Sequence, residues 1–233
     1  MALPSIATPE FITKIPSTGQ EIRYRPFLVK EEKILLMALE GKDSNEIMLS
    51  VQNVLKNCIL SEDVSVNKLA TFDIEYLFLK LRSKSVGEVI KIKVNHANDS
   101  ECKYATEVDI NIDKINVEGD IKDGKLMLTD KVGLKLRYPT MEDLKGISID
   151  DAESMFKMVR KCIEFIFDED NVYSDFTEKE LSDWIDSLNQ TQFAKITQFF
   201  EGMPKLSHKI DWECKSCGKN DSVTVEGLQG FFI

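Results

Sequence analysis

The chain has 233 residues and a formal net charge of −10, so it is long enough to bury a core and too acidic to have nucleic acid or an anionic membrane as its main partner. An apolar share of 42% is ordinary for a water-soluble protein, and no apolar run reaches the length of a bilayer span. The N-terminus lacks the features of a signal peptide, and five cysteines at low density favour a reducing compartment over a disulfide scaffold.

Residues 1–27 are expected to form an extended N-terminal arm. Prolines remove backbone donors and disfavour helix in the residue before them, and this segment has four: Pro4, Pro9, Pro16 and Pro26. A hairpin-like piece over residues 15–25 is predicted to turn at residues 17–19. The arm is either a surface loop or a segment laid on a neighbouring subunit, and the sequence favours neither.

A helical region is predicted over residues 28–87. Apolar residues recur at helical spacing in three segments, which predicts helices over residues 29–40, 44–60 and 73–83. Cys58 falls on the apolar face of the second helix, where a small core residue is expected rather than a metal ligand.

A β-rich region is predicted over residues 88–140. Alternation of apolar and polar residues predicts strands over residues 88–94 and 108–112, and a second pair over 126–128 and 134–138. The loop between the first two strands is polar and contains His96 and Cys102.

Helices are expected to return over residues 141–203. Ser148 and Asp151 have capping-box spacing, and an apolar stripe over residues 155–166 predicts a helix after them. A second box at Thr177 and Glu180 begins another helical pattern that extends to Gly202. Met155, Met158 and Cys162 on the first stripe are expected in the core.

The last region, residues 204–233, is predicted to be a β-knuckle. Strands over residues 208–212 and 222–225 flank Cys214, Cys217 and Gly218, and residues 28–233 are expected to form one compact unit. The fold class is therefore α+β: helical segments flank a small, mostly antiparallel sheet with a C-terminal CxxC knuckle.

The CxxC motif has three interpretations. Two cysteines three positions apart, followed by a glycine, supply half of a tetrahedral zinc site, and the loop after the first strand offers the other half. The candidate zinc ligands are His96, Cys102, Cys214 and Cys217, with His208 as a substitute for His96. The motif is otherwise a tight turn with two free thiols. A thioredoxin-like redox pair is less favoured, because that motif opens a helix whereas strands are predicted on both sides here.

The remaining motifs argue against an enzyme. The sequence has no Gly-rich phosphate loop, HExxH or GxSxG pattern, and its two histidines do not suggest a catalytic set. The acidic run at residues 168–171 fails the EF-hand pattern, because Val172 and Tyr173 stand where a ligand and the turn glycine belong. No cofactor other than a candidate structural zinc is expected.

Several segments resemble the baseplate hub subunit family of T-even-like contractile-tailed phages. They are the Lys-Ile-Pro-Ser-Thr-Gly run at residues 14–19, residues 25–36, the helix-forming segment at 72–88, and the C-terminal knuckle with the Gly-Leu and Phe-Phe pairs after it. The resemblance implies a non-enzymatic component or assembly factor of the central hub, built in the host bacterial cytoplasm for the virion tail baseplate. It implies other hub and tail proteins as partners, with self-association left open. Two alternatives stand beside it: a cytosolic thiol-redox enzyme using Cys214 and Cys217, and a zinc-stabilised adaptor outside any phage.

Overall fold

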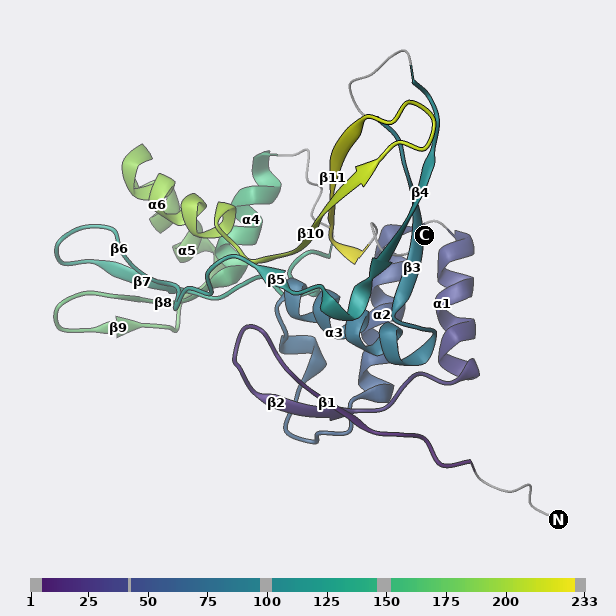
Figure 1. The fold of residues 1–233 in the computed structure, drawn as a ribbon. Helices are drawn as coiled ribbons and strands as arrows, with labels where there is room; N and C mark the ends of the chain where they lie inside the picture. The colour runs from purple at the N-terminus through teal and green to yellow at the C-terminus, as the bar shows by residue number, and fades with distance from the viewer. Residues whose placement is uncertain (1–5, 42, 97–101, 146–151, 229–233) are drawn as a thin grey trace. The chain divides into compact units, whose positions relative to one another are not determined.

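The computed structural model describes residues 6–41, 43–96, 102–145 and 152–228, and it divides into two compact units (Figure 1). Unit 1 comprises the described parts of residues 1–66, 72–118 and 205–233, and unit 2 comprises those of 67–71 and 119–204. The sequence predicted one compact unit over residues 28–233, whereas the structure has two. The predicted β-rich region is divided between them: its first strand pair belongs to unit 1, and its second pair belongs to unit 2.

The α+β class is confirmed, but the expected single sheet is replaced by four small sheets among the described residues, with every strand pairing antiparallel. None of the described helices is both long and apolar enough to cross a membrane.

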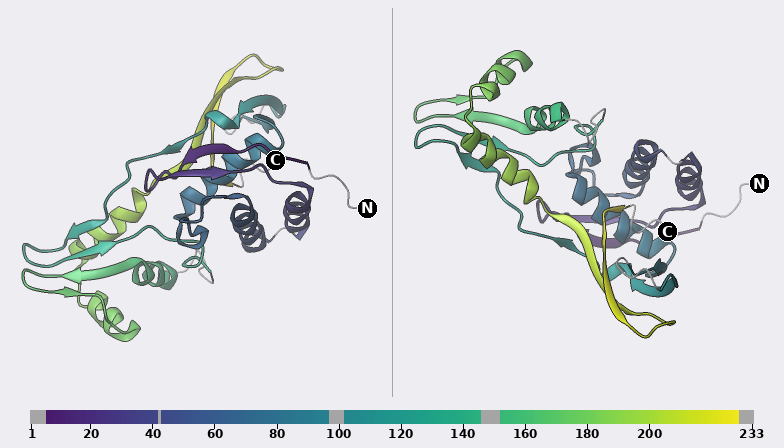
Figure 2. Two further views of the ribbon diagram at one scale, coloured as in Figure 1. Left: turned by 90° about the horizontal axis from the view of Figure 1, so that it is seen from below. Right: turned by 90° about the horizontal axis from the view of Figure 1, so that it is seen from above.

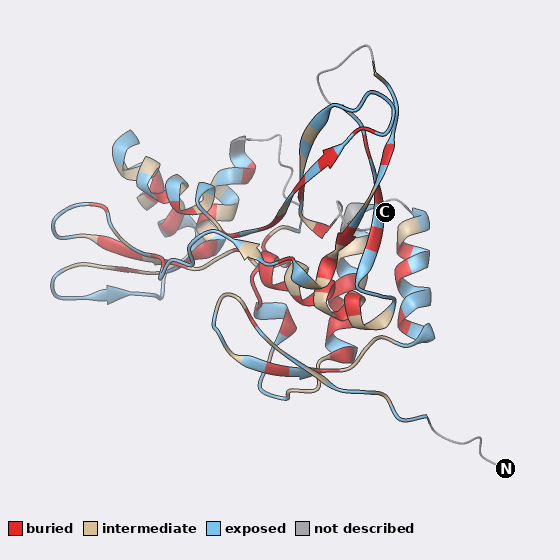
Figure 3. Cartoon of the chain, viewed as in Figure 1, coloured by how far each residue is buried: buried red, intermediate tan, exposed pale blue. Residues whose placement is uncertain are grey.

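Three helices of unit 1 lie close to their predicted positions: α1 (Val29–Gly41), α2 (Ser44–Cys58) and α3 (Thr71–Ser85). Helices α1 and α2 lie side by side, seen nearly end-on in Figure 2. Helix α3 is the most buried of the three, as the red segments of Figure 3 show, because apolar residues cover most of its circumference. A short 3-10 turn, η1 (Val66–Lys68), precedes it.

The N-terminal segment is not an extended arm from Phe11 onward. Strands β1 (Phe11–Lys14) and β2 (Glu21–Tyr24) pair as a hairpin whose inward side chains Ile15 and Ile22 are buried. In the turn between them, the Ser17 backbone N–H donates to the buried Asp73 carboxylate of α3 at 2.9 Å. The described prolines lie outside the two strands and therefore cost no ladder hydrogen bonds.

Two long hairpins complete unit 1, and they lie side by side in both views of Figure 2. One consists of β3 (Val89–Val94) and β4 (Thr106–Asn111), and the 3-10 turn η2 (Ile112–Lys114) follows it. The other consists of β10 (Lys205–Glu213) and β11 (Asn220–Glu226), with β5 (Val117–Glu118) paired to the start of β10.

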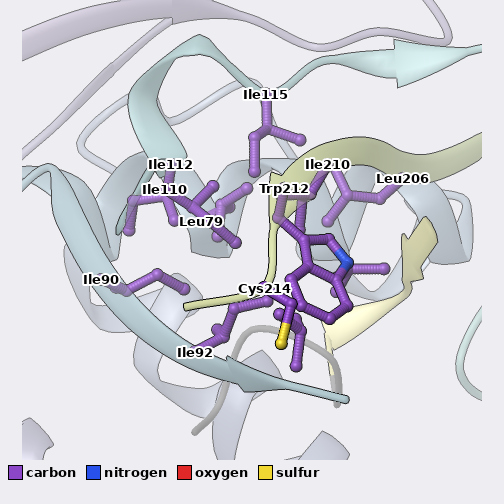
Figure 4. Close-up of a cluster of buried hydrophobic side chains, with 12 residues drawn as sticks. Leu79, Ile90, Ile92, Ile110, Ile112, Ile115, Leu206, Ile210, Trp212 and Cys214 are labelled. Carbon is purple, nitrogen blue, oxygen red and sulfur yellow. The ribbon is translucent and has the colours of Figure 1, made fainter. Parts of the chain in front are cut away.

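The inward faces of these hairpins pack on one another and on Leu79 of α3 (Figure 4). The buried residues of this cluster are Leu79, Ile90, Ile92, Val94, Ile110, Ile112, Ile115, Leu206, Ile210, Trp212, Cys214 and Val225. The core of unit 1 therefore extends to the base of the CxxC knuckle.

Unit 2 is built on a four-stranded meander of β6 (Lys125–Met127), β7 (Gly133–Leu136), β8 (Ile163–Phe167) and β9 (Val172–Tyr173). Helices α4 (Ala152–Cys162), α5 (Glu178–Asp186) and α6 (Gln190–Glu201) belong to the same unit and share its core. The predicted capping box is confirmed: Thr177 accepts from the Glu180 backbone N–H, and the Glu180 carboxylate accepts from that of Thr177.

The helix predicted over residues 155–166 is wrong in its last four residues. Helix α4 ends at Cys162, and the next residues form β8, which pairs with β7. The sequence Ile-Glu-Phe-Ile-Phe is rich in β-branched and aromatic residues, and a short apolar run of this kind satisfies both periodicities. Met155 is exposed rather than in the core, and the box at Ser148 and Asp151 lies outside the described residues.

Candidate metal centre

The four candidate ligands lie at the tips of the two long hairpins of unit 1. His96 follows β3 and Cys102 precedes β4, whereas Cys214 follows β10 and Cys217 precedes β11. Their ligand atoms all lie within 4.8 Å of one another. Two segments that are more than a hundred residues apart in the chain thus bring three thiols and one imidazole to a single point.

The knuckle between β10 and β11 folds around its own backbone. The backbone N–H of Cys214 donates to the Lys219 carbonyl at 2.9 Å, and that of Gly218 donates to the Cys214 carbonyl at 2.9 Å. Gly218 has φ of 69°, a left-handed conformation that side chains other than Asn and Asp rarely adopt. This turn leaves the backbone N–H groups of Ser216 and Cys217 directed at the Cys214 sulfur, and that of Lys219 directed at the Cys217 sulfur.

Two short contacts join the cluster, and each is between a ligand of the β3–β4 hairpin and a ligand of the β10–β11 hairpin. The sulfurs of Cys102 and Cys214 lie 3.7 Å apart, and the Cys217 sulfur lies 3.4 Å from Nε2 of His96. Cys214 is buried at 1% exposure, Cys102 is half-buried and Cys217 is exposed. The cluster therefore has a dry side against the core and an open side toward solvent.

The local fields favour a thiolate at Cys214. Backbone N–H donation, first from Cys217, lowers the pKa of the Cys214 thiol to about 6. The pKa of Cys217 is raised instead, because desolvation and the neighbouring thiols outweigh the hydrogen bond from the Lys219 backbone. The carboxylate of Asp221 raises the pKa of His96 through its hydrogen bond.

The centre includes two further residues, Asp221 and Trp212, which the sequence did not indicate. Asp221, the second residue of β11, accepts or shares the Nδ1 proton of His96 at 2.8 Å. The indole of Trp212 lies against the imidazole with ring centroids 4.8 Å apart. One carboxylate among many in an acidic chain carries no signal of such a role, because its significance depends on the register of β11.

His208, the alternative to His96, does not join the cluster. It lies within β10 opposite Val225, toward the other end of the hairpin from the knuckle. The structure thus brings together the four residues of the candidate set, and binding of zinc by them stays a prediction.

The other cysteines occupy the core, as predicted. Cys58 and Cys162 are fully buried, and burial raises their pKa values to about 11 and about 12. The acidic run after β8 forms a turn in which the Asp168 carboxylate accepts the backbone N–H groups of Asp170 and Asn171. Its carboxylate is thus used to shape an exposed loop.

Comparisons with known proteins agree with one family. Residues 8–233 match the family of T4 bacteriophage base plate proteins. Searches of the curated proteins and of the solved structures gave no significant match. Because the family match covers nearly all of both units, the chain belongs to the T4 bacteriophage base plate protein family.

Proposed function

We propose that this protein is a structural component or assembly factor of the central hub of the tail baseplate, and that it acts through contacts with other hub and tail proteins. The observation that carries the proposal is the family match over residues 8–233, together with the resemblance of residues 14–19, 25–36 and 72–88 to baseplate hub subunits. The protein would act in the host cytoplasm during assembly and, as a component, remain in the virion baseplate.

A candidate contact surface lies on the outer face of α1. Val29, Leu36 and Met37 are seven and eight positions apart and so share one helical face, and Met37 is 72% exposed. Figure 3 shows this side of α1 largely in the colour of exposed residues. Apolar residues gathered on an exposed helix face are typical of a protein–protein interface, and the proposed occupant is another subunit of the hub.

The thiol-redox alternative is weakened by how exposure and acidity are distributed over the two cysteines. A redox-active thiol is both acidic and accessible. Here the acidic thiol, Cys214, is buried, whereas the accessible one, Cys217, has a raised pKa. Thiol titration of the folded protein separates the two functions: a freely reactive Cys214 that forms a reversible disulfide with Cys217 favours the enzyme.

Phage assembly tests the proposed function directly. In an infection with a tagged copy, the protein is expected in hub-assembly intermediates, in finished baseplates or in both. Its absence from both throughout infection would reject the proposal, as would normal tails from a null mutant.

Variants of α1 test the contact surface separately. Leu36→Glu and Met37→Glu are expected to lower recovery of the protein in hub fractions at least tenfold, while the purified chain keeps its thermal stability. Asn53→Glu, an exposed change on α2 that adds the same single negative charge, is the matched control. Equal recovery of all three variants would move the interface elsewhere, and a shift from self-association to monomer would identify a second copy as the occupant.

A further inference from the structure

We infer that His96, Cys102, Cys214 and Cys217 bind one structural zinc ion, and that this ion fastens the β3–β4 hairpin to the β10–β11 hairpin. The geometry of the four side chains carries the inference, which does not depend on the proposed role in the hub. Three cysteines and one histidine at one point are an established ligand set for closed, structural zinc sites.

Two of the separations between ligand atoms match those of a tetrahedral zinc site. With Zn–S bonds of about 2.3 Å, two sulfurs on a tetrahedral ion lie about 3.8 Å apart, and a sulfur and a nitrogen lie about 3.5 Å apart. The Cys102 and Cys214 sulfurs are 3.7 Å apart, and Cys217 Sγ and His96 Nε2 are 3.4 Å apart. A disulfide would need about 2.05 Å between sulfurs, so Cys102 and Cys214 are free thiols whose separation leaves room for an ion bound to both.

The surroundings of the ligands also suit a thiolate-rich zinc site. Backbone N–H groups of Ser216, Cys217 and Lys219 donate to the sulfurs of the knuckle and would offset the negative charge that three thiolates leave on the complex. The hydrogen bond from His96 Nδ1 to Asp221 leaves Nε2 as the coordinating atom, an arrangement that recurs around zinc-bound histidines.

The position of the centre gives the ion a structural task. Each hairpin supplies two ligands, so one ion would cross-link loops whose other described contacts include the His96–Asp221 hydrogen bond at 2.8 Å and a weaker one from the Lys215 backbone N–H to Thr106 at 3.4 Å. Cys214 belongs at the same time to the buried cluster of the two hairpins. The zinc site would therefore continue the contact between the two hairpins from their apolar core to their polar tips.

The ligand set selects among metals. Three thiolates and an imidazole disfavour magnesium and calcium, which prefer oxygen ligands. Four protein ligands leave no open position for a substrate, as in structural rather than catalytic zinc sites. The role inferred is thus mechanical: the ion holds the two tips in register.

Elemental analysis of the full chain, purified under reducing conditions without chelator, tests the inference. About one zinc per chain is expected. Cys102→Ser and Cys217→Ser should bind less than a tenth of that amount. Ser216→Ala, within the knuckle, and Cys162→Ala, which removes a thiol of unit 2, should retain it. Because Cys217 is exposed, its serine variant changes one surface atom and should fold.

Cobalt substitution of the wild-type protein keeps the test independent of any variant. A tetrahedral thiolate site is expected to give strong visible d–d bands and a near-ultraviolet charge-transfer band. Hydrogen exchange should show the hairpin tips opening on chelation while β7 and β8 of unit 2 stay protected. Folded protein that takes up no zinc after reconstitution, binds iron instead, gives an octahedral cobalt spectrum, or contains a Cys102–Cys214 disulfide would overturn the inference.

Discussion

Asp221 Oδ2 lies 2.8 Å from Nδ1 of His96, across the two hairpins of unit 1, and Nε2 of the same imidazole faces the Cys217 sulfur. A neutral imidazole carries one ring proton, and a carboxylate beside Nδ1 draws that proton to Nδ1. The acceptor lone pair is then at Nε2. One carboxylate thus sets both the orientation and the tautomer of the histidine.

Replacing Asp221 by Asn should lower zinc affinity 10- to 100-fold, the usual effect of removing a partner of a metal-bound histidine. The fold should persist, because Asp221 is only partly buried at the start of β11. Competition with a chromophoric chelator measures the affinity. Asp211→Asn, an exposed change on the adjacent strand β10, is the control. Equal loss in both variants would point to general destabilisation of the hairpin and not to the hydrogen bond.

The hairpin at the N-terminus should behave as part of the core. Ile22 of β2 is 1% exposed and Ile12 of β1 is 62% exposed. The same substitution at the two positions therefore compares a buried with an exposed isoleucine of one hairpin. Ile22→Ala should destabilise unit 1 by about 2–5 kcal/mol, and Ile12→Ala by about 0.5 kcal/mol or less. Urea unfolding measures both. Similar small effects would restore the interpretation of this segment as a loosely attached arm.

A buried ion pair connects this hairpin to α1. Arg25 donates to the Glu31 carboxylate at 3.0 Å, and Glu31 accepts a second bond from the Leu28 backbone N–H at 2.8 Å. Although desolvation opposes it, the bond from Arg25 holds the pKa of Glu31 below its usual value. Arg25→Ala should destabilise the fold by about 3–5 kcal/mol, because the buried Glu31 carboxylate loses its buried cation and keeps only the exposed Lys30 ammonium, 3.4 Å away, as an ion-pair partner.

Arg23→Ala is the matched control for the ion pair. Arg23 pairs with Glu10 at 3.5 Å with both side chains more than half exposed, which predicts an effect of about 1 kcal/mol or less. Equal losses in the two variants, measured by thermal unfolding at low salt, would contradict the role assigned to burial.

Much of the fold could be predicted from local pattern. The helices α1, α2 and α3 and the strands of both long hairpins lie within a few residues of their expected positions, because each has a clear period or cap. The strand β8 was missed because its apolar run fits either period, and only pairing with β7 decides between them. The division into two units follows from which strands pair, and no local pattern records that choice.

The candidate site shows the same division between local and tertiary information. The CxxCG spacing indicated Cys214 and Cys217 from neighbouring residues alone, and the loop position of His96 and Cys102 indicated the rest. The choice of His96 over His208 depends on which end of β10 faces the other hairpin. The roles of Asp221 and Trp212 depend on register in the same way, so only the structure could show them.

The stability of unit 1 should depend on pH through Glu75 on α3, and the burial of this carboxyl determines the sign of the dependence. Desolvation raises the pKa of this carboxyl from 4.5 to about 7, although the Leu228 backbone N–H donates to it. The folded state therefore binds the proton more tightly than the unfolded state. The stabilisation by protonated Glu75 is complete below about pH 4.5 and is lost as the pH rises to about 7, an effect of up to about 3 kcal/mol before solvent screening.

Replacing Glu75 by Gln should remove this loss, because the amide stays neutral at every pH. The difference in unfolding free energy between Glu75→Gln and the parent should grow from pH 5 to pH 8 in favour of the variant, and taking the difference cancels other groups that titrate in this range. The chain has two tryptophans, so a Trp184→Phe background leaves Trp212 as the fluorescent reporter of unit 1. Glu32→Gln, an exposed change on α1, should follow the parent. A constant difference across this range would show that Glu75 is charged in the folded protein and that burial does not govern its titration.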